Sequence, residues 1–188
     1  SCMLDAVEEH LAQRAVRTTR VQDPGGTEIG QQIRKVLLRP ENRRMCAMTE
    51  LLLYVASRAQ LVEERIRPAL ERGEVVLSDR FFLSTLVYQG VAGVLPEAAL
   101  EEVVALGVEG CRPHHTLLLD VPAAVGLARA GQAPDRMEQK GLAFHEQVRG
   151  RYLARARQAE SGTMHVVDGS RPIDAVRREI LEIVDAVI

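Results

Sequence analysis

The chain of 188 residues lacks the features that mark secreted, membrane and metal-binding proteins. Its three cysteines, Cys2, Cys46 and Cys111, are odd in number and scattered, which argues against a disulfide framework or a zinc site and suits a reducing cytoplasm. No apolar run is long enough to span a membrane, and the acidic residues of the opening SCMLDAVEEHLAQR do not fit a signal peptide. These absences predict a cytoplasmic protein without a membrane partner.

An excess of charge of one sign is also lacking. The 24 Lys and Arg against 26 Asp and Glu give a formal net charge of −2, so the overall field does not attract nucleic acid. Lysine occurs only at Lys35 and Lys140, whereas arginine is plentiful. We therefore expect no nucleic-acid partner, and any bound anion must be held by local groups of arginines.

The length and the 46% hydrophobic content predict a single domain over residues 1–188. Four segments have the composition of strands: 16–22, 74–80, 115–121 and 164–168. Helical patterns fall at 2–13, 28–38, 46–71 with an interruption at Pro68, 81–90, 96–109, 122–130, 138–159 and 172–187. Strands that alternate with helices predict a parallel α/β sheet. The continuous runs VVL and LLL predict strands covered on both faces, and the alternating segment 16–22 fits a sheet edge.

The segment DPGGTEIG, residues 23–30, is predicted to be a turn from a strand into a helix. Two glycines let the backbone approach a ligand closely, and free N–H groups at a helix N-terminus favour an anion. The alternative is an ordinary turn in which Thr27 is the N-cap.

Tyr54 and Arg58 are spaced four residues apart and therefore share one face of a predicted helix. A ring and a guanidinium in this arrangement could hold a flat heterocycle, and the alternative is a core tyrosine beside a surface arginine.

Asp79 and Arg80 stand where a hydrophobic strand ends, the edge at which open α/β sheets bind ligands. In the helix predicted to follow, Thr85, Tyr88 and Gln89 lie on neighbouring turns. Arg80 near the start of this helix could bind a phosphate with two hydrogen bonds. The alternative is that Asp79 caps the helix and pairs with Arg80.

Four arginines, Arg129, Arg136, Arg149 and Arg151, flank the segment 131–136, which glycine and proline mark as a loop. Arginines on a closing loop can compensate the charge of a transferring phosphoryl group, although charged residues beside loops are commonly just solvated. No set of metal ligands can be assigned from the spacing.

Five ordered motifs together resemble the bacterial type of thymidylate kinase: DPGGTEIG, TELLLYVASRAQ, SDRFFLSTLVYQG, TLLLDVPAAVGLARA and DRMEQKGLAFHEQVRGRY. The resemblance implies a P-loop nucleoside monophosphate kinase, a three-layer sandwich in which helices flank a central parallel sheet. It also implies transfer of the γ-phosphoryl group of ATP to dTMP, which makes dTDP for dTTP synthesis, with Mg²⁺ and as a homodimer.

The resemblance assigns substrate-binding roles to Tyr54, Arg58, Asp79, Arg80, Thr85, Tyr88 and Gln89. Tyr54 corresponds to the aromatic that stacks on thymine and Arg58 to the residue that hydrogen-bonds the base. Thr85 and Gln89 would face the edge of the base.

The phosphate roles follow from the same resemblance. Arg80 would grip the dTMP phosphate, and Tyr88 would lie near the sugar. Residues 129–138 correspond to the lid, with Arg129 or Arg136 as the transition-state cation and ATP contact. The acceptor phosphate, with a second pKa near ~6, needs no general base.

The family's first strand and its G-x-x-x-x-G-K-[ST] loop do not occur in this sequence. By the resemblance that strand is central, and Ser1 falls near the end of the ATP-binding loop. We expect both parts in the working kinase. Gln22 and Asp23 replace an Arg-Glu pair, so one positive charge is lost. Two alternatives are a nucleotide-binding pseudokinase or regulatory subunit, and a kinase for another nucleoside monophosphate.

Overall fold

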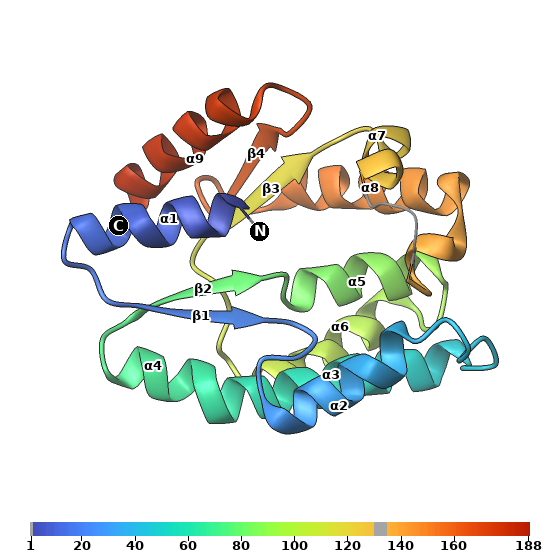
Figure 1. The fold of residues 1–188 in the computed structure, drawn as a ribbon. Helices are drawn as coiled ribbons and strands as arrows, with labels where there is room; N and C mark the ends of the chain where they lie inside the picture. Colours follow the sequence, from blue (N-terminus) through green and yellow to red (C-terminus); the bar gives the residue numbers. More distant parts are fainter. Residues whose placement is uncertain (1, 130–134) are drawn as a thin grey trace. The chain divides into compact units, whose positions relative to one another are not determined.

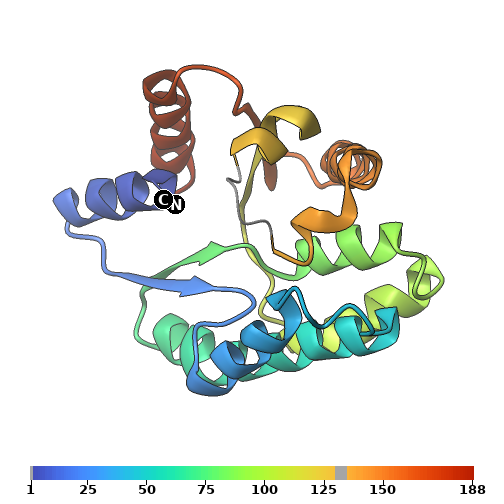
Figure 2. The same ribbon diagram turned by 45° about the vertical axis from the view of Figure 1, so that its right-hand side comes forward.

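The computed structural model describes residues 2–129 and 135–188, and it divides the chain into two compact units. We call Ala15–Arg112 with Asp135–Met137 the middle unit. The remainder, built from Ser1–Arg14, Pro113–Pro134 and Glu138–Ile188, is the terminal unit. Figures 1 and 2 show the elements of each unit in two orientations.

The middle unit is built on two parallel strands, β1 (Thr18–Gln22) and β2 (Val75–Asp79), with Thr18 opposite Val75. Its helices are α2 (Glu28–Leu38), α3 (Ala47–Leu61), a π-helical turn (Val62–Ile66), α4 (Arg67–Glu71), α5 (Phe82–Val91) and α6 (Glu97–Val108). Both strands end where the chain turns toward a helix, which brings the turn after Gln22 next to Asp79.

Two apolar clusters hold the helices of the middle unit. Leu61 of α3 packs in one with Val21 of β1 and Phe81, and Leu51 of α3 packs in the other with Leu100 of α6. Because Leu51 and Leu61 are buried near the two ends of α3, the helix between them has a fixed position in the middle unit.

The predicted helical stretch 46–71 forms in three successive segments. The backbone changes from π-helical to α-helical at Arg67, and Pro68 stands in the first turn of α4, where a missing N–H is tolerated. Gly73 follows with a φ of 70°, a left-handed conformation that suits the end of a helix.

The terminal unit contains a second parallel pair, β3 (Thr116–Asp120) and β4 (Met164–Asp168), with Thr116 opposite Met164. Its helices are α1 (Cys2–Gln13), α7 (Ala123–Arg129), a 3₁₀ turn (Glu138–Lys140), α8 (Leu142–Gln158) and α9 (Ile173–Val187). Helices α1 and α9 lie side by side in both views. Asp185 of α9 joins them by accepting hydrogen bonds from His10 and Arg14 of α1.

The predicted α/β class with parallel strands is confirmed, and each observed strand falls inside its predicted segment. The prediction that the apolar strands are covered on both faces is wrong for the described residues. Every residue of β2 is only half-buried, and Leu119 of β3 is 39% exposed. In the part of the chain that is described, each strand pairs with one neighbour, so one backbone edge of each strand has no strand beside it. The single domain stays a prediction.

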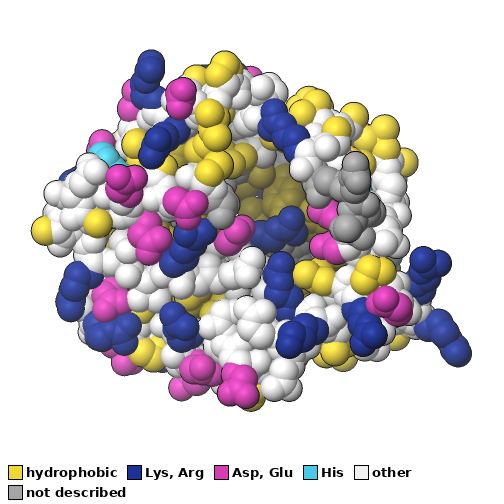
Figure 3. All heavy atoms as spheres, viewed as in Figure 1, with side chains coloured by type: hydrophobic (Ala, Val, Ile, Leu, Met, Phe, Trp, Pro, Cys, Tyr) yellow, Lys and Arg dark blue, Asp and Glu magenta, His cyan; other side chains and the backbone are white. Residues whose placement is uncertain are grey.

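Across the described ranges, we find no helix with the length and apolar character that a membrane crossing requires. Figure 3 shows basic and acidic side chains interspersed over one face of the surface, in keeping with the balanced composition.

Candidate functional site

The buried polar side chains of the described residues all belong to the middle unit. We call this set the buried polar cluster: Asp23, Thr27, Glu50, Ser57, Arg58, Thr85 and Gln89. They come from the turn after β1, from α3 and from α5. A polar group is costly to bury unless it is hydrogen-bonded, so their partners indicate what the cluster does.

Arg58 is the centre of the cluster, with a side chain that is only 1% exposed. Its Nε donates to Asp23 Oδ2 at 2.7 Å and its Nη2 donates to Thr85 Oγ1 at 2.8 Å. The guanidinium also lies 5.6 Å from the ring centre of Phe81. Three contacts from three elements fix its orientation, and the alternative of a surface arginine at this position is wrong.

Two buried atoms of this pair have no hydrogen-bond partner among the described residues: Arg58 Nη1 and Asp23 Oδ1. Burial raises the pKa of Asp23, and the positive charges of Arg58, Arg80 and Arg34 act in the opposite direction. Arg58 Nη1 is a buried donor on a guanidinium whose position is fixed, and it can donate a hydrogen bond to a carbonyl oxygen of a ligand.

The turn 23–30 is shaped by short contacts of its backbone. Gly25 N donates to Ser57 Oγ at 3.1 Å, and Gly30 N donates to Thr27 Oγ1 at 2.9 Å. Thr27 is thus the N-cap of α2, as the alternative interpretation predicted. A Cβ on Gly30 would stand 2.6 Å from Gly25 O, so the close turn requires glycine there. Anion binding by this turn stays a prediction.

Glu50, in the first turn of α3, is the second charged residue of the cluster, with a side chain 3% exposed. Its Oε1 accepts from Gln89 Nε2 at 2.7 Å, and its Oε2 pairs with Arg136 Nη2 at 2.5 Å. The predicted base-edge residue Gln89 and the predicted lid residue Arg136 are therefore joined through one carboxylate.

Tyr54 lies one turn after Glu50 on α3 and is half-buried. Burial raises the pKa of its phenol above the ordinary value of 10, and the negative charge of Glu50 raises it further. The phenol is therefore neutral throughout the physiological range, and its ring can serve as a flat apolar surface.

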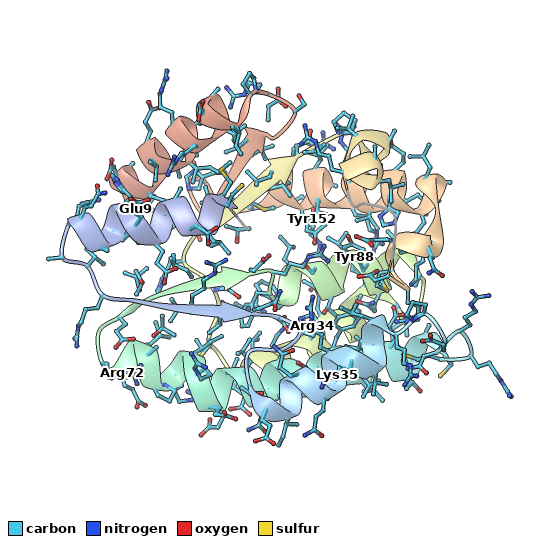
Figure 4. All side chains as sticks on the ribbon, in the orientation of Figure 1. Glu9, Arg34, Lys35, Arg72, Tyr88 and Tyr152 are labelled. Carbon is cyan, nitrogen blue, oxygen red and sulfur yellow. The ribbon has the colours of Figure 1, made fainter. Side chains whose placement is uncertain are left out.

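Arg80 comes directly after β2, and its backbone has a φ of 66°, in the left-handed region that non-glycine residues rarely adopt. Ser78 Oγ donates to its carbonyl oxygen at 2.5 Å, and its guanidinium lies 5.6 Å from the ring centre of Tyr88 on α5. Tyr88 is labelled in Figure 4. Asp79 accepts the backbone N–H of Asp23 at its carbonyl oxygen, 3.1 Å away, so β2 and the turn after β1 meet here. A left-handed φ at a non-glycine residue, as at Arg80, commonly marks a functional position.

The other predicted residues belong to the terminal unit. Arg129 is exposed in the terminal unit and donates to Gly169 O at 3.0 Å. Arg149 holds Asp120 with two hydrogen bonds of 2.7 and 2.9 Å. Ser1 and residues 130–134 of the predicted lid lie outside the described residues. Over the described ranges, no group of three or more His, Cys, Asp or Glu side chains could hold a metal ion.

Sequence reasoning missed the role of Glu50 and treated Asp23 only as a departure from the family pattern. One signal was present for Glu50, because it is an acid at the start of the apolar run LLLYVA. Its partners, 39 and 86 positions further along the chain, leave no local pattern.

Comparisons with known proteins identify the family of the chain. A family model described as thymidylate kinase matches residues 1–180. A thymidylate kinase of Symbiobacterium thermophilum is 45% identical over 181 residues, which cover 96% of this chain and 84% of that protein. One of Alcanivorax borkumensis is 48% identical over 166 residues, covering 87% and 79%. One of Syntrophotalea carbinolica is 47% identical over 174 residues, covering 88% and 79%.

These matches confirm the predicted resemblance and the predicted enzyme class, a kinase that is a phosphotransferase. They support dTMP phosphorylation as the predicted function, and neither alternative finds support among them. With a family match over nearly its whole length, the chain belongs to the thymidylate kinase family.

Proposed function

We propose that this chain transfers the γ-phosphoryl group of ATP to dTMP and forms dTDP. The observation that carries the proposal is the family match over residues 1–180. The buried polar cluster supports the proposal, because Arg58 is enclosed and its Nη1 has no hydrogen-bond partner among the described residues. Such a donor suits a small polar heterocycle better than a macromolecule that binds at the surface.

Base recognition is proposed for the region of Arg58. Its Nη1 would donate to a carbonyl oxygen of thymine, while Asp23 and Thr85 hold the guanidinium in place. The neutral ring of Tyr54 would stack on the base. Gln89, on the same face of α5 as Thr85, would face the edge of the base.

Phosphate binding is proposed for Arg80, which stands at the carboxyl end of β2 with its side chain exposed. A guanidinium can bind a phosphate with two parallel hydrogen bonds. Because the guanidinium of Arg80 contacts the ring of Tyr88, that ring would then lie near the sugar of the nucleotide. Because the acceptor phosphate is already ionised, catalysis consists of positioning and charge compensation. Arg129 or Arg136 is proposed as the transition-state cation. Ser1, Arg129 and Arg136 are proposed as contacts of ATP.

Mg²⁺ dependence, a cytoplasmic location and a homodimer are further parts of the proposal. For the homodimer, support comes from large apolar side chains exposed on three helices of the middle unit: Ile29 of α2, Leu52 of α3 and Leu106 of α6. Sedimentation analysis of the full-length protein tests this, and a monomer at all concentrations would contradict it.

The experiment for the activity is a coupled assay of ADP release by the full-length protein with ATP, Mg²⁺ and dTMP. We expect Arg80→Ala to lower kcat/KM by about 10²-fold, the effect of removing one charge-stabilising donor. The matched control is Arg44→Ala, because Arg44 is an exposed arginine of the same unit.

Absence of turnover with dTMP would contradict the proposal. Equal rates for the two arginine variants would contradict the role of Arg80. Chelation of Mg²⁺ by EDTA should abolish turnover, and addition of excess Mg²⁺ should restore it. Preference for another nucleoside monophosphate would favour the alternative of a related kinase.

A further inference from the structure

Glu50 is a buried carboxylate that the roles proposed above do not use. A charge with only 3% of its side chain exposed is costly to bury unless it is paired and hydrogen-bonded. Its two oxygens contact two different elements, α5 through Gln89 and the segment Asp135–Met137 through Arg136. Glu50 therefore joins its own helix α3, which also carries Tyr54, to α5, which carries Thr85, and to the segment Asp135–Met137.

Arg136, the partner of Glu50 Oε2, is held in place by several contacts in this arrangement. Besides the ion pair with Glu50, its Nε donates to Leu37 O at 2.7 Å and its backbone N–H donates to Leu38 O at 3.3 Å. Both carbonyls stand at the C-terminus of α2, where a cation is favourable. The positive charge neutralises Glu50, and the side chain of Arg136 is only 11% exposed.

Gln89, the second partner, is oriented by the same carboxylate. A carboxylate can only accept hydrogen bonds, so the NH₂ end of the Gln89 amide must face Glu50. The carbonyl oxygen of this amide then takes the other direction. Without the negative charge, the two ends of the amide would be nearly equivalent in size and could exchange places.

We propose that Glu50 is a positioning residue that sets the pyrimidine specificity of the nucleoside site. It makes Gln89 offer an acceptor, its Oε1, in a cluster where Arg58 offers a donor, its Nη1. Thymine presents a carbonyl oxygen and a ring N–H, which require one donor and one acceptor from the protein. Cytosine presents an amino group beside an unprotonated ring nitrogen, which is the reverse pattern.

This inference rests on the proposed function, and its test is Glu50→Gln in the full-length protein. Steady-state kcat and KM are measured with dTMP, with dCMP and with ATP. We expect kcat/KM for dTMP to fall about tenfold, mainly through KM, as for the loss of one charge-assisted hydrogen bond. The ratio of kcat/KM for dTMP over dCMP should also fall, and the KM for ATP should stay the same.

Glu64→Gln is the matched control, because Glu64 also accepts a hydrogen bond from a glutamine amide, that of Gln60, but at the surface. It should keep the wild-type preference. Should Glu50→Gln fail to fold, Glu50→Asp keeps the charge but withdraws it by one methylene group, and a smaller fall in the dTMP preference is expected from it.

An equal fall of kcat/KM for dTMP and dCMP would overturn the specificity role, because a merely structural effect lowers both alike. An unchanged preference in a folded variant would overturn it as well. Failure of the proposed function is a separate result, since the wild-type protein itself would then show no turnover with dTMP.

Discussion

The two units of the chain treat charged side chains differently. In the middle unit, Arg58, Asp23 and Glu50 are buried and paired, and all fully buried polar side chains of the described residues belong to this unit. In the terminal unit, the ion pairs are more exposed: the side chain of Asp120, which pairs with Arg149, is 22% exposed, and that of Asp185, which binds His10 and Arg14, is 50% exposed.

The terminal unit shows that helices and parallel strands of this chain pack without buried charges. Burying an ion pair is often no better for stability than burying apolar side chains of the same size. The buried pairs of the middle unit therefore need a reason other than stability. A fixed donor such as Arg58 Nη1, ready to bind a substrate, is such a reason.

The largest effect that separates the two units is expected for Asp23→Asn. It leaves the charge of Arg58 buried without a counter-ion, which costs about 3–5 kcal/mol in the free energy of unfolding. The matched change in the terminal unit is Asp185→Asn, which breaks exposed pairs and should cost about 0–1 kcal/mol. Urea denaturation of both variants at pH 7 measures the difference.

Equal losses in the two variants would erase the contrast between buried and exposed pairs. The double variant Asp23→Leu, Arg58→Met sharpens the contrast further. Because it removes both charges, we expect it to recover much of the lost stability but to bind no dTMP. A double variant that still binds dTMP would show that the buried pair is not needed for nucleoside binding.

The next effect concerns the ring of Tyr54. Tyr54→Leu should weaken dTMP binding about tenfold or more, since stacking of a base on an aromatic ring is worth ~1–3 kcal/mol. Tyr54→Phe should bind nearly normally, because the pKa of the phenol is raised and no charge is lost. For the same reason, the affinity of the wild-type protein should show no contribution from Tyr54 between pH 7 and 9.

Isothermal titration calorimetry of dTMP binding checks both variants. Tyr152 of α8, labelled in Figure 4, belongs to the terminal unit and provides the matched control. Tyr152→Leu should leave the affinity for dTMP unchanged. A loss as large as that of Tyr54→Leu would place the nucleoside outside the buried polar cluster.

The elements that depend on local patterns were predictable from the sequence. The strands β1 to β4 and the helix that carries Tyr54 and Arg58 follow from runs of apolar residues, from the alternation in 16–22 and from a spacing of four. The N-cap Thr27 was also predictable, as an alternative, because its hydrogen bond with Gly30 N joins residues only three positions apart.

The pairing inside the cluster was not predictable, because its partners are far apart in sequence. Arg58 and Asp23 are separated by 35 positions, and Glu50 and Gln89 by 39. Arg136 was predicted to be a lid residue and a candidate transition-state cation, and its bond to the carbonyl of Leu37, 99 positions earlier, was not predictable. No local period encodes contacts over such separations, which only the folded chain creates.

A smaller effect is expected for the helix cap. Thr27→Ala removes the buried acceptor of Gly30 N and should cost about 1 kcal/mol. Thr163 of the terminal unit donates its hydroxyl to Glu160 O at an exposed site, so Thr163→Ala should change the free energy of unfolding by no more than about 0.5 kcal/mol. Urea denaturation of the two variants decides whether burial, and not the hydrogen bond as such, sets the difference.

The smallest effect is expected for Asp120→Asn in the terminal unit. Two hydrogen bonds from Arg149 hold the pKa of Asp120 below its usual range. A carboxylate whose pKa is lower in the folded state stabilises the fold above its unfolded pKa, near ~3.9, and loses this contribution as the pH falls through the folded pKa. The variant should therefore be less stable than the wild type by about 0.2–1 kcal/mol at pH 7, and the difference should shrink toward pH 2. Urea midpoints at both pH values measure this; a difference that does not change with pH would mean that the ion pair of Asp120 contributes through its packing and not through its charge.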